Sequence, residues 1–470
     1  MKTTDIQSDD SQSNDIQSDD SQANEKSNKT MSDQRVDYWS KLLKTVTANT
    51  GDTSGWVDQV RSKATAIAQE LALPSTRDEE WRFTDLSAML DIEFVPAEVI
   101  ASPAIDVATL AIDEAKNSRL VFVNSRYSAE LSDLSGLADG ITVGHYSADR
   151  GGALNDTVQE YLAHIQTSAE GFTALNTSAV EQVAAIAVDR NVVIDTPIHV
   201  VFLTTGSGAI AQPRCLIVAE ANSRCTVIEE HRALNCALDD AAPGQPYWVN
   251  GVTEVSLGAN GEVSHTRIQR DNGTAFHIGN TAIAQARDSR YTLTSLDLGA
   301  QVSRHNVTVN QGGSGTETNF NGLNVATAQQ TSDTHTFLNL QHPHSGADQL
   351  HKCVAGDRGH TVFNGRVLVG QQAQQTNAAQ LNRNLLLSSK ARVDTKPQLE
   401  IIADDVKCTH GATVSQLEDG EIFYLRSRGL DEIAARRLLL DGFVGEILER
   451  LPVDSLRAPL AAAIATQIRS

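Results

Sequence analysis

The feature that most constrains this chain is a long region, from about Val183 to Val414, in which short β-branched runs alternate with small-residue turns. The turn segments resemble one another, as in A-N-S-R-C-T-V-I at 221, A-N-G-E-V-S-H-T at 259, A-R-D-S-R-Y-T-L at 286 and A-Q-V-S-R-H-N-V at 300. No amphipathic helices separate the runs, so this self-similarity predicts a stacked parallel β-helix rather than a βαβ sheet. An antiparallel sandwich is the alternative.

The segments on either side differ in pattern. Residues 1–34 are polar and acidic and repeat D-I-Q-S-D-D-S-Q at 5–12 and 15–22, so we predict a disordered acidic tail. Helical spacing begins at Arg35 and recurs at 56–71, and residues 35–178 are expected to form a mixed helical domain with some strands. The β-helix is expected over 179–421, followed by a helical domain over 422–470.

The C-terminal helical domain has clear signals of its own. Asp431 is a good N-cap, and Gly442 is expected to separate two short helices. An apolar stripe can cap the β-helix or bind a partner; it comprises Ile433, Ala434, Leu438, Phe443, Val444, Ile447, Leu448 and Leu451.

Charge and cysteine content limit the partners and the compartment. The net charge of −21 disfavours nucleic acid and anionic membrane surfaces as partners. No apolar run is long enough to span a membrane, and the N-terminus has neither a signal core nor the arginines of a transit peptide. Five cysteines without a C-x-x-C pair indicate reduced thiols, so a cytoplasmic location is expected, and Cys215 and Cys225 are predicted to be small core residues on strands.

Familiar catalytic motifs are missing from the sequence. It contains no Gly-Lys dipeptide, and therefore no Walker A loop, and it lacks the G-x-S-x-G, H-E-x-x-H and Rossmann patterns. His342, His344, His351 and Cys353 match no usual ligand spacing, so we interpret them as a polar loop rather than a metal site. The amide-rich runs at 371–377 and 377–384 fit solenoid turns or polar outer faces.

The sharpest candidate site is Cys408-Thr409-His410. On a strand, residues two apart share a face, so the thiol and the imidazole project together. Both donors suit iron or zinc, but two ligands do not complete a tetrahedral site. A buried cysteine beside a histidine at the end of a turn remains the alternative.

Several motifs around this pair resemble the SufD branch of the SufB and SufD family, which belongs to the SUF iron-sulfur cluster assembly machinery. They are T-V-F-N-G at 361–365, Q-Q-T-N at 374–377, N-R-N-L-L-L at 382–387, K-P-Q-L-E-I at 396–401, A-D-D-V-K-C-T-H-G-A-T-V at 403–414 and F-Y-L-R-S-R-G at 423–429. The SufB branch carries an essential cysteine upstream of the C-T-H motif, whereas residues 382–389 here have none.

The resemblance implies a right-handed parallel β-helix between helical end domains. It also implies a non-catalytic scaffold subunit, which pairs with a SufB-like paralogue through the β-helix and with a SufC-like ATPase through helices at about 425–451. An iron-sulfur cluster, transient and shared with the paralogue, is the implied cofactor, and a reduced flavin in the complex is compatible with it.

On the same resemblance, the family's functional histidine falls on His410, with Cys408 beside it as the second metal-ligand candidate. The ATPase-binding candidates are Arg426, Arg428, Leu438, Phe443 and Ile447. Two hypotheses from other classes stay open: a β-helix enzyme acting on a polysaccharide, and a purely structural interaction protein.

Overall fold

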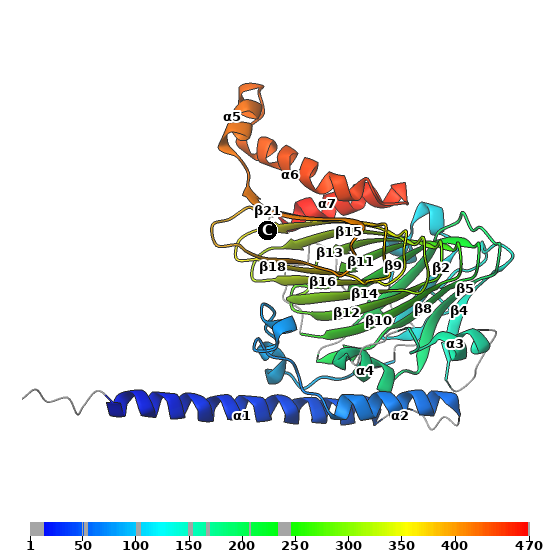
Figure 1. Ribbon diagram of the computed structural model, residues 1–470, viewed down its shortest axis with the longest axis horizontal. Coiled ribbons are helices and arrows are strands. Elements are labelled where there is room, and N and C mark those ends of the chain that lie inside the picture. Colours follow the sequence, from blue (N-terminus) through cyan, green and yellow to red (C-terminus); the bar gives the residue numbers. More distant parts are fainter. Residues whose placement is uncertain are drawn as a thin grey trace, which may run out of the picture.

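Two facing β-sheets, joined by short turns, wind the central part of the chain into a parallel β-solenoid (Figure 1). The structure is a computed structural model that describes residues 14–48, 50, 55–99, 105–148, 154–165, 170–205, 208–233 and 246–468. Strand pairs are parallel throughout both sheets, except for the β2–β3 and β4–β5 pairs. The parallel β-helix prediction is therefore confirmed, and the antiparallel sandwich is excluded.

Each turn of the solenoid contributes one strand to each sheet. The eleven-stranded sheet contains β20 (Arg392–Ile401), β18 (His360–Val369), β16 (Thr331–Leu340), β14 (Val302–Gln311), β12 (Phe276–Gln285), β10 (Trp248–Leu257), β8 (Arg214–Ala219), β5 (Gln182–Val188), β4 (Ile141–Ser147), β7 (Ala209–Ala211) and β1 (Val95–Pro96). The ten-stranded sheet contains β21 (Val406–Gln416), β19 (Thr376–Leu386), β17 (Gly346–Ala355), β15 (Glu317–Ala326), β13 (Arg290–Asp297), β11 (Glu262–Arg270), β9 (Arg224–Ala233), β6 (Ile198–Thr204), β2 (Arg119–Val123) and β3 (Arg126–Tyr127).

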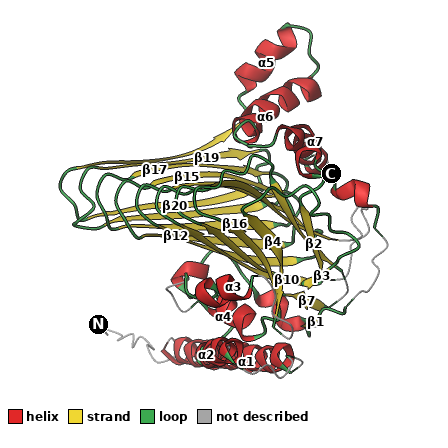
Figure 2. Ribbon diagram, turned by 90° about the vertical axis from the view of Figure 1, so that its right-hand side faces the viewer, coloured by secondary structure: helices red, strands yellow, loops and turns green. Residues whose placement is uncertain are grey.

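Helices cover the outer faces of both sheets, on opposite sides of the solenoid (Figure 2). On the eleven-stranded sheet lie α1 (Asn14–Thr47), α2 (Trp56–Gln69), α3 (Asn155–Tyr161) and α4 (Gly171–Ser178). On the ten-stranded side lie α5 (Asp419–Ser427), α6 (Glu432–Leu448) and α7 (Arg457–Gln467). Short 3-10 helices are η1 (Glu79–Trp81), η2 (Ser87–Asp91), η3 (Val107–Leu110), η4 (Asp113–Ala115) and η5 (Asp454–Leu456).

The repeated turn segments have a structural counterpart. Asn222, Asn260 and Asp288 occupy equivalent corners of successive turns, each with a left-handed backbone that Asn and Asp tolerate well. The side-chain amide of Asn260 donates to Asn222 at 3.1 Å, so the corners form a ladder along the axis. The fourth segment, with Ala300, lies at the opposite edge, where the chain returns to the first sheet.

The strands are longer than the β-branched runs in the sequence. The runs at 361–363 and 367–369, for example, belong to the single ten-residue strand β18, which continues through Asn364, Gly365 and Arg366. Polar residues are tolerated there because backbone hydrogen bonds to the turns before and after hold the strand along its whole length.

The N-terminal helix begins earlier than expected. We predicted residues 1–34 to be disordered; residues 1–13 lie outside the described residues, whereas residues 14–34 belong to α1, which runs to Thr47 without a break. Its second half packs through Trp39, Leu42 and Leu43 into the core under the eleven-stranded sheet. Residues 14–47 include no glycine or proline, so the packed half can propagate a helix into the polar half.

The C-terminal helices pack through part of the apolar stripe, with one difference from the prediction. Gly442 does not separate two helices, because α6 continues from Glu432 to Leu448. Val444, Ile447 and Leu448 are buried against leucines and valines on the outer face of the ten-stranded sheet. A single glycine costs a helix only about 1 kcal/mol relative to alanine, and this packing offsets that cost.

A buried lysine fastens α6 to the sheet. The Nζ of Lys352, on the outer face of β17, donates to the carbonyl oxygen of Phe443 at 2.8 Å and lies 4.4 Å from the centre of the Phe443 ring. The same ammonium pairs with Glu446. Burial lowers the pKa of Lys352, while the Glu446 carboxylate acts in the opposite direction.

We expect Lys352→Met to lower the free energy of unfolding by about 1–3 kcal/mol, because the ion pair and the helix contact are lost while the side-chain volume is kept. Urea unfolding would measure the change. Lys390→Met, at an exposed lysine, is the matched control and should have little effect. Equal stability of the two variants would show that Lys352 does not anchor α6.

Candidate functional site

The candidate pair lies on the last turn of the solenoid. Cys408 and His410 belong to β21, which pairs with β19 on one side and has its other edge free among the described strands. The neighbouring edge strand of the other sheet is β20. The pair therefore lies at the open end of the solenoid, where no further turn covers it.

Strand alternation places the two side chains on one side of β21. Val406 and Cys408 pack against the apolar core between the two sheets. The same alternation puts His410 on the side of β21 that faces this interior of the solenoid, which we call the bore. Cys408 is half-buried and His410 is exposed. Burial raises the pKa of the Cys408 thiol, while a hydrogen bond from the backbone of Ala378 acts in the opposite direction.

Cys408 and His410 supply an incomplete ligand set. Within the described part of the chain, no three His, Cys, Asp or Glu side chains gather in an arrangement that could hold a metal ion. A thiol and an imidazole are donors that iron accepts, but a tetrahedral site needs further ligands. The pair therefore fits a metal or cluster only where another molecule contributes the remaining donors.

The other histidine-rich segment does not form a cluster. His342 and His344 lie in the turn before β17, whereas His351 and Cys353 are buried inside the solenoid on that strand. The His351 ring stacks on Phe363, with ring centres 4.6 Å apart. The polar-loop interpretation therefore applies only to the first two residues, because the β17 alternation turns the other two into the core.

The predicted ATPase-binding residues separate into exposed and buried ones. Arg426, Arg428 and Leu438 are exposed on α5, on the residue after it and on α6. Phe443 is half-buried beneath Lys352, and Ile447 is fully buried against the sheet. Ile447 is therefore a core residue, because the α6 face that carries it is the one that packs on the solenoid.

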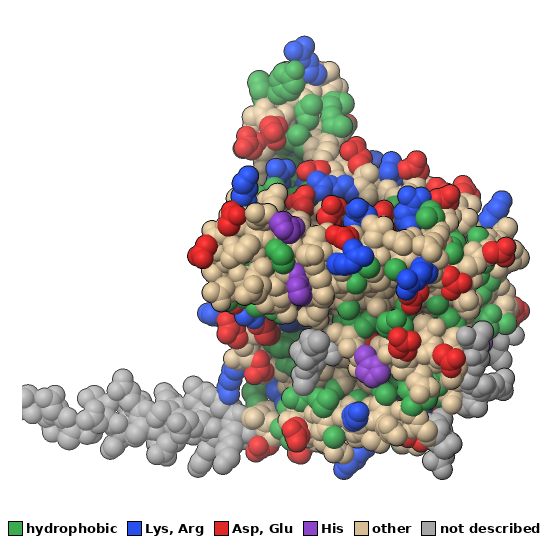
Figure 3. Space-filling model, turned by 45° about the vertical axis from the view of Figure 1, so that its right-hand side comes forward, with side chains coloured by type: hydrophobic (Ala, Val, Ile, Leu, Met, Phe, Trp, Pro, Cys, Tyr) green, Lys and Arg blue, Asp and Glu red, His purple; other side chains and the backbone are tan. Residues whose placement is uncertain are grey.

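An apolar surface on the projecting helices joins Ile433 and Leu438 of the predicted stripe to Phe423, Tyr424 and Leu430, which the sequence analysis did not select. Phe423 and Ile433 have exposed fractions of 73% and 76%, and Tyr424, Leu430 and Leu438 are exposed beside them. These side chains gather on the part of the molecule that stands away from the solenoid (Figure 3). Exposed apolar patches of this kind typically mark protein interaction sites.

The solenoid interior also holds a buried polar network that the sequence did not reveal. Glu229 accepts a hydrogen bond from Thr253 at 2.7 Å, and Arg267 pairs with Asp297 at 2.8 Å. Burial lowers the pKa of His277 to about 4, although its partner Asp271 acts in the opposite direction. The groups named here pair with one another inside the core, which offsets the cost of burying them.

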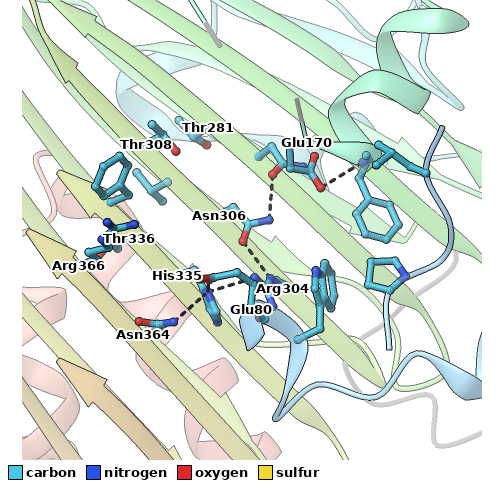
Figure 4. A pocket seen from close by; sticks show the side chains of 18 of the residues that line it. Glu80, Glu170, Thr281, Arg304, Asn306, Thr308, His335, Thr336, Asn364 and Arg366 are labelled. Atoms are coloured by element: carbon cyan, nitrogen blue, oxygen red, sulfur yellow. Dashed lines mark hydrogen bonds and ion pairs between the residues drawn. The ribbon is translucent and has the colours of Figure 1, made fainter. Parts of the chain in front are cut away.

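A separate cavity of about 510 Å³ lies between the N-terminal helical layer and the outer face of the eleven-stranded sheet (Figure 4). Two of its lining groups pair with each other, since His335 contacts Glu80 at 3.2 Å, and the lining residue Arg304 contacts the buried Asp333 at 3.2 Å. Glu170, the other carboxylate in the described lining, caps α4 through the backbone N–H groups of residues 172 and 173. Both lining carboxylates are thus hydrogen-bonded within the chain, and burial raises the pKa of Glu170 while its backbone hydrogen bonds act in the opposite direction.

No helix in the described residues is long and apolar enough to cross a membrane. Of the five cysteines, Cys215, Cys225, Cys353 and Cys408 are free thiols, and Cys236 lies outside the described residues. Cys215 and Cys225 are buried on strands of the core, as expected from the sequence.

Comparisons with known proteins connect this architecture to iron-sulfur chemistry. Residues 202–443 match the family model described as "SUF system FeS cluster assembly, SufBD core domain", and residues 31–200 match the "SufBD protein N-terminal region". The first model covers the solenoid and the C-T-H motif, and the second covers the helical layer and the first strands.

Curated relatives agree with the family models. The chain is 42% identical to an iron-sulfur cluster assembly SufBD family protein of Synechocystis, over 91% of this chain and 95% of the relative. It is 32% identical to the iron-sulfur cluster assembly protein SufD of Escherichia coli, over 84% and 89% of the two chains. It is 26% identical to SufD of Bacillus subtilis, over 88% and 94%. The chain therefore belongs to the SufBD family of iron-sulfur cluster assembly proteins.

Proposed function

We propose that this chain is a SufD-type scaffold subunit, which pairs with a SufB-type paralogue and binds a SufC-type ATPase during iron-sulfur cluster assembly. The observation that carries the proposal is the Cys408 and His410 pair on the free edge of the last turn. Two metal ligands at an unpaired strand edge suit a site whose remaining ligands come from a second subunit. The cluster is then cargo of the complex, and the proposal does not include a flavin site.

The open end of the solenoid supports pairing with a paralogue. The outer edges of β20 and β21 present backbone N–H and C=O groups that another strand can bind. Ile401, Ile402 and Val414 are exposed at this end. A second solenoid seated here would continue both sheets and bring its own donors next to His410.

The projecting helices support binding of the ATPase. Their exposed apolar side chains are rimmed by Arg426, Arg428 and other charged residues, which is the usual composition of a protein interface. The sequence has no phosphate-binding loop of its own, so ATP hydrolysis has to come from a partner. We propose on this basis that the subunit is not itself a catalyst. Its free cysteines motivate the separate proposal that it acts in the cytoplasm.

Two alternatives make different predictions. A polysaccharide-cleaving enzyme would turn over glycans as an isolated chain, and we expect no such turnover. A purely structural protein would leave the complex unable to hold a cluster at the subunit interface. Anaerobic reconstitution of the complete complex, followed by absorption spectroscopy, separates that outcome from the proposed function.

We expect His410→Ala to reduce cluster loading of the reconstituted three-protein complex at least tenfold, because loss of a ligand or its support typically costs about 10–100-fold in metal affinity. Absorption of the cluster measures loading, and co-purification checks that the complex is intact. His342→Ala, in a turn distant in sequence from β21, is the control. Normal loading by an intact His410→Ala complex would refute the role of His410.

We expect Leu438→Asp to abolish co-purification of the ATPase while the solenoid stays folded, because a charge would be buried at the interface. Circular dichroism monitors the fold, and gel filtration monitors the complex. Val99→Asp, at an exposed valine in the N-terminal part, should bind normally. Retained ATPase binding by Leu438→Asp would show that the projecting helices serve another purpose.

A further inference from the structure

A column of side chains inside the solenoid leads to His410. Leu293, Phe320, Gln349, Gln380 and His410 occupy the same register position in five successive turns of the ten-stranded sheet. Parallel strands lie roughly 4.8 Å apart, so side chains at one register position are nearest neighbours. The column is apolar at Leu293 and Phe320, one turn above the buried His265, and it carries amides in the two turns before His410.

The two amides are held in a fixed orientation. Gln349 donates from Nε2 to the hydroxyl of Thr336 at 2.9 Å, and Gln380 donates from Nε2 to Oε1 of Gln349 at 2.9 Å. Across the bore is Gly365, where a Cβ would lie 2.2 Å from Nε2 of Gln380. The missing side chain at Gly365 therefore leaves the space that the Gln380 amide occupies.

This arrangement leaves one acceptor unused. The Oε1 of Gln380 is buried and has no hydrogen-bond partner within the described residues, and only 2% of the residue is exposed. A buried acceptor without a partner destabilises the folded state, so its retention calls for an explanation. The next side chain in the column is the exposed imidazole of His410, which carries a ring N–H and makes no hydrogen bond to this oxygen in the structure.

We propose that Gln380 is a positioning residue whose carboxamide oxygen accepts the ring N–H of His410 and thereby fixes the tautomer and direction of the imidazole. The inference rests on the proposed function, since it assigns His410 to the shared site. Histidines that bind metals usually donate their other ring N–H to a nearby acceptor, which orients the free nitrogen. A carboxamide does this without adding a charge to the bore.

The hydrogen bonds within the column account for the unpaired oxygen of Gln380. Gln380 donates to Gln349 and Gln349 donates to Thr336, so this run of hydrogen bonds leads away from His410 and leaves the oxygen of Gln380 without a donor among the described residues. His410 is then held from below, and its other nitrogen is free to face a partner subunit. The half-buried Cys408, on the same face of β21, is the adjacent donor.

The test uses Gln380→Met, which keeps the length of the side chain but has no oxygen, and Gln380→Glu, which keeps an acceptor. Ring nitrogen shifts of ¹⁵N-histidine in the full-length chain report the tautomer of His410, identified by its loss in His410→Ala. We expect one tautomer in the wild type and in Gln380→Glu, and a mixture in Gln380→Met. Two tautomers in the wild-type chain would overturn the proposal, even if Gln380→Met fails to fold.

Cluster loading in the three-protein complex gives the functional readout. We expect Gln380→Met to load about tenfold less cluster, Gln380→Glu to recover most of it, and the exposed control Gln372→Met to load normally. Normal loading and an unchanged tautomer in a folded Gln380→Met chain would overturn the role of Gln380 alone. Normal loading by His410→Ala would instead refute the proposed function, while the tautomer of the isolated chain would still test the contact.

Discussion

The in-register stacking of parallel turns is the constraint on which the rest of this structure depends. Each strand residue has neighbours at the same position in the turn before and the turn after. The stack keeps the bore closed to water over most of its length, and it allows columns of like side chains, such as the asparagines at the corners and the glutamines near the end. Stacking also leaves the last turn with an unpaired edge, because no further strand among those described pairs with β20 or β21.

The last turn of the solenoid carries both the Cys408 and His410 motif of the family and the unpaired strand edges of β20 and β21. Cys408 and His410 face the bore at the end of the solenoid, so under the proposed function their remaining ligands would come from beyond β20 and β21. Helix α6 packs on the outer face of the same sheet, and Lys352 fastens it to β17, whose neighbour β19 supports β21. A displacement of α6 would therefore be passed to β21, which carries His410, through β17 and the β17–β19 and β19–β21 pairings.

The candidate site was partly visible in the sequence. The spacing of Cys408 and His410 predicts a common face, and the structure confirms it, since two-residue periodicity holds wherever a strand forms. Gln380 could not be identified in this way, because an amide-rich run is typical of turns and polar surfaces, and only the strand register shows that it lies below His410. Ile447 looked like one more member of an apolar stripe, but the stripe is wide enough to serve both faces of α6, and packing decides which residues remain exposed.

The sequence by itself determined the solenoid class, the helical ends, the buried cysteines and the absence of a phosphate loop, because these depend on local periodicity, composition and short motifs. Tertiary structure alone decided the continuity of α6 through Gly442, the extension of α1 back to Asn14, the buried polar network and the column under His410. These features depend on which residues from different turns come to lie side by side. One-dimensional patterns do not record that register, because it is set by the pairing of strands about thirty residues apart.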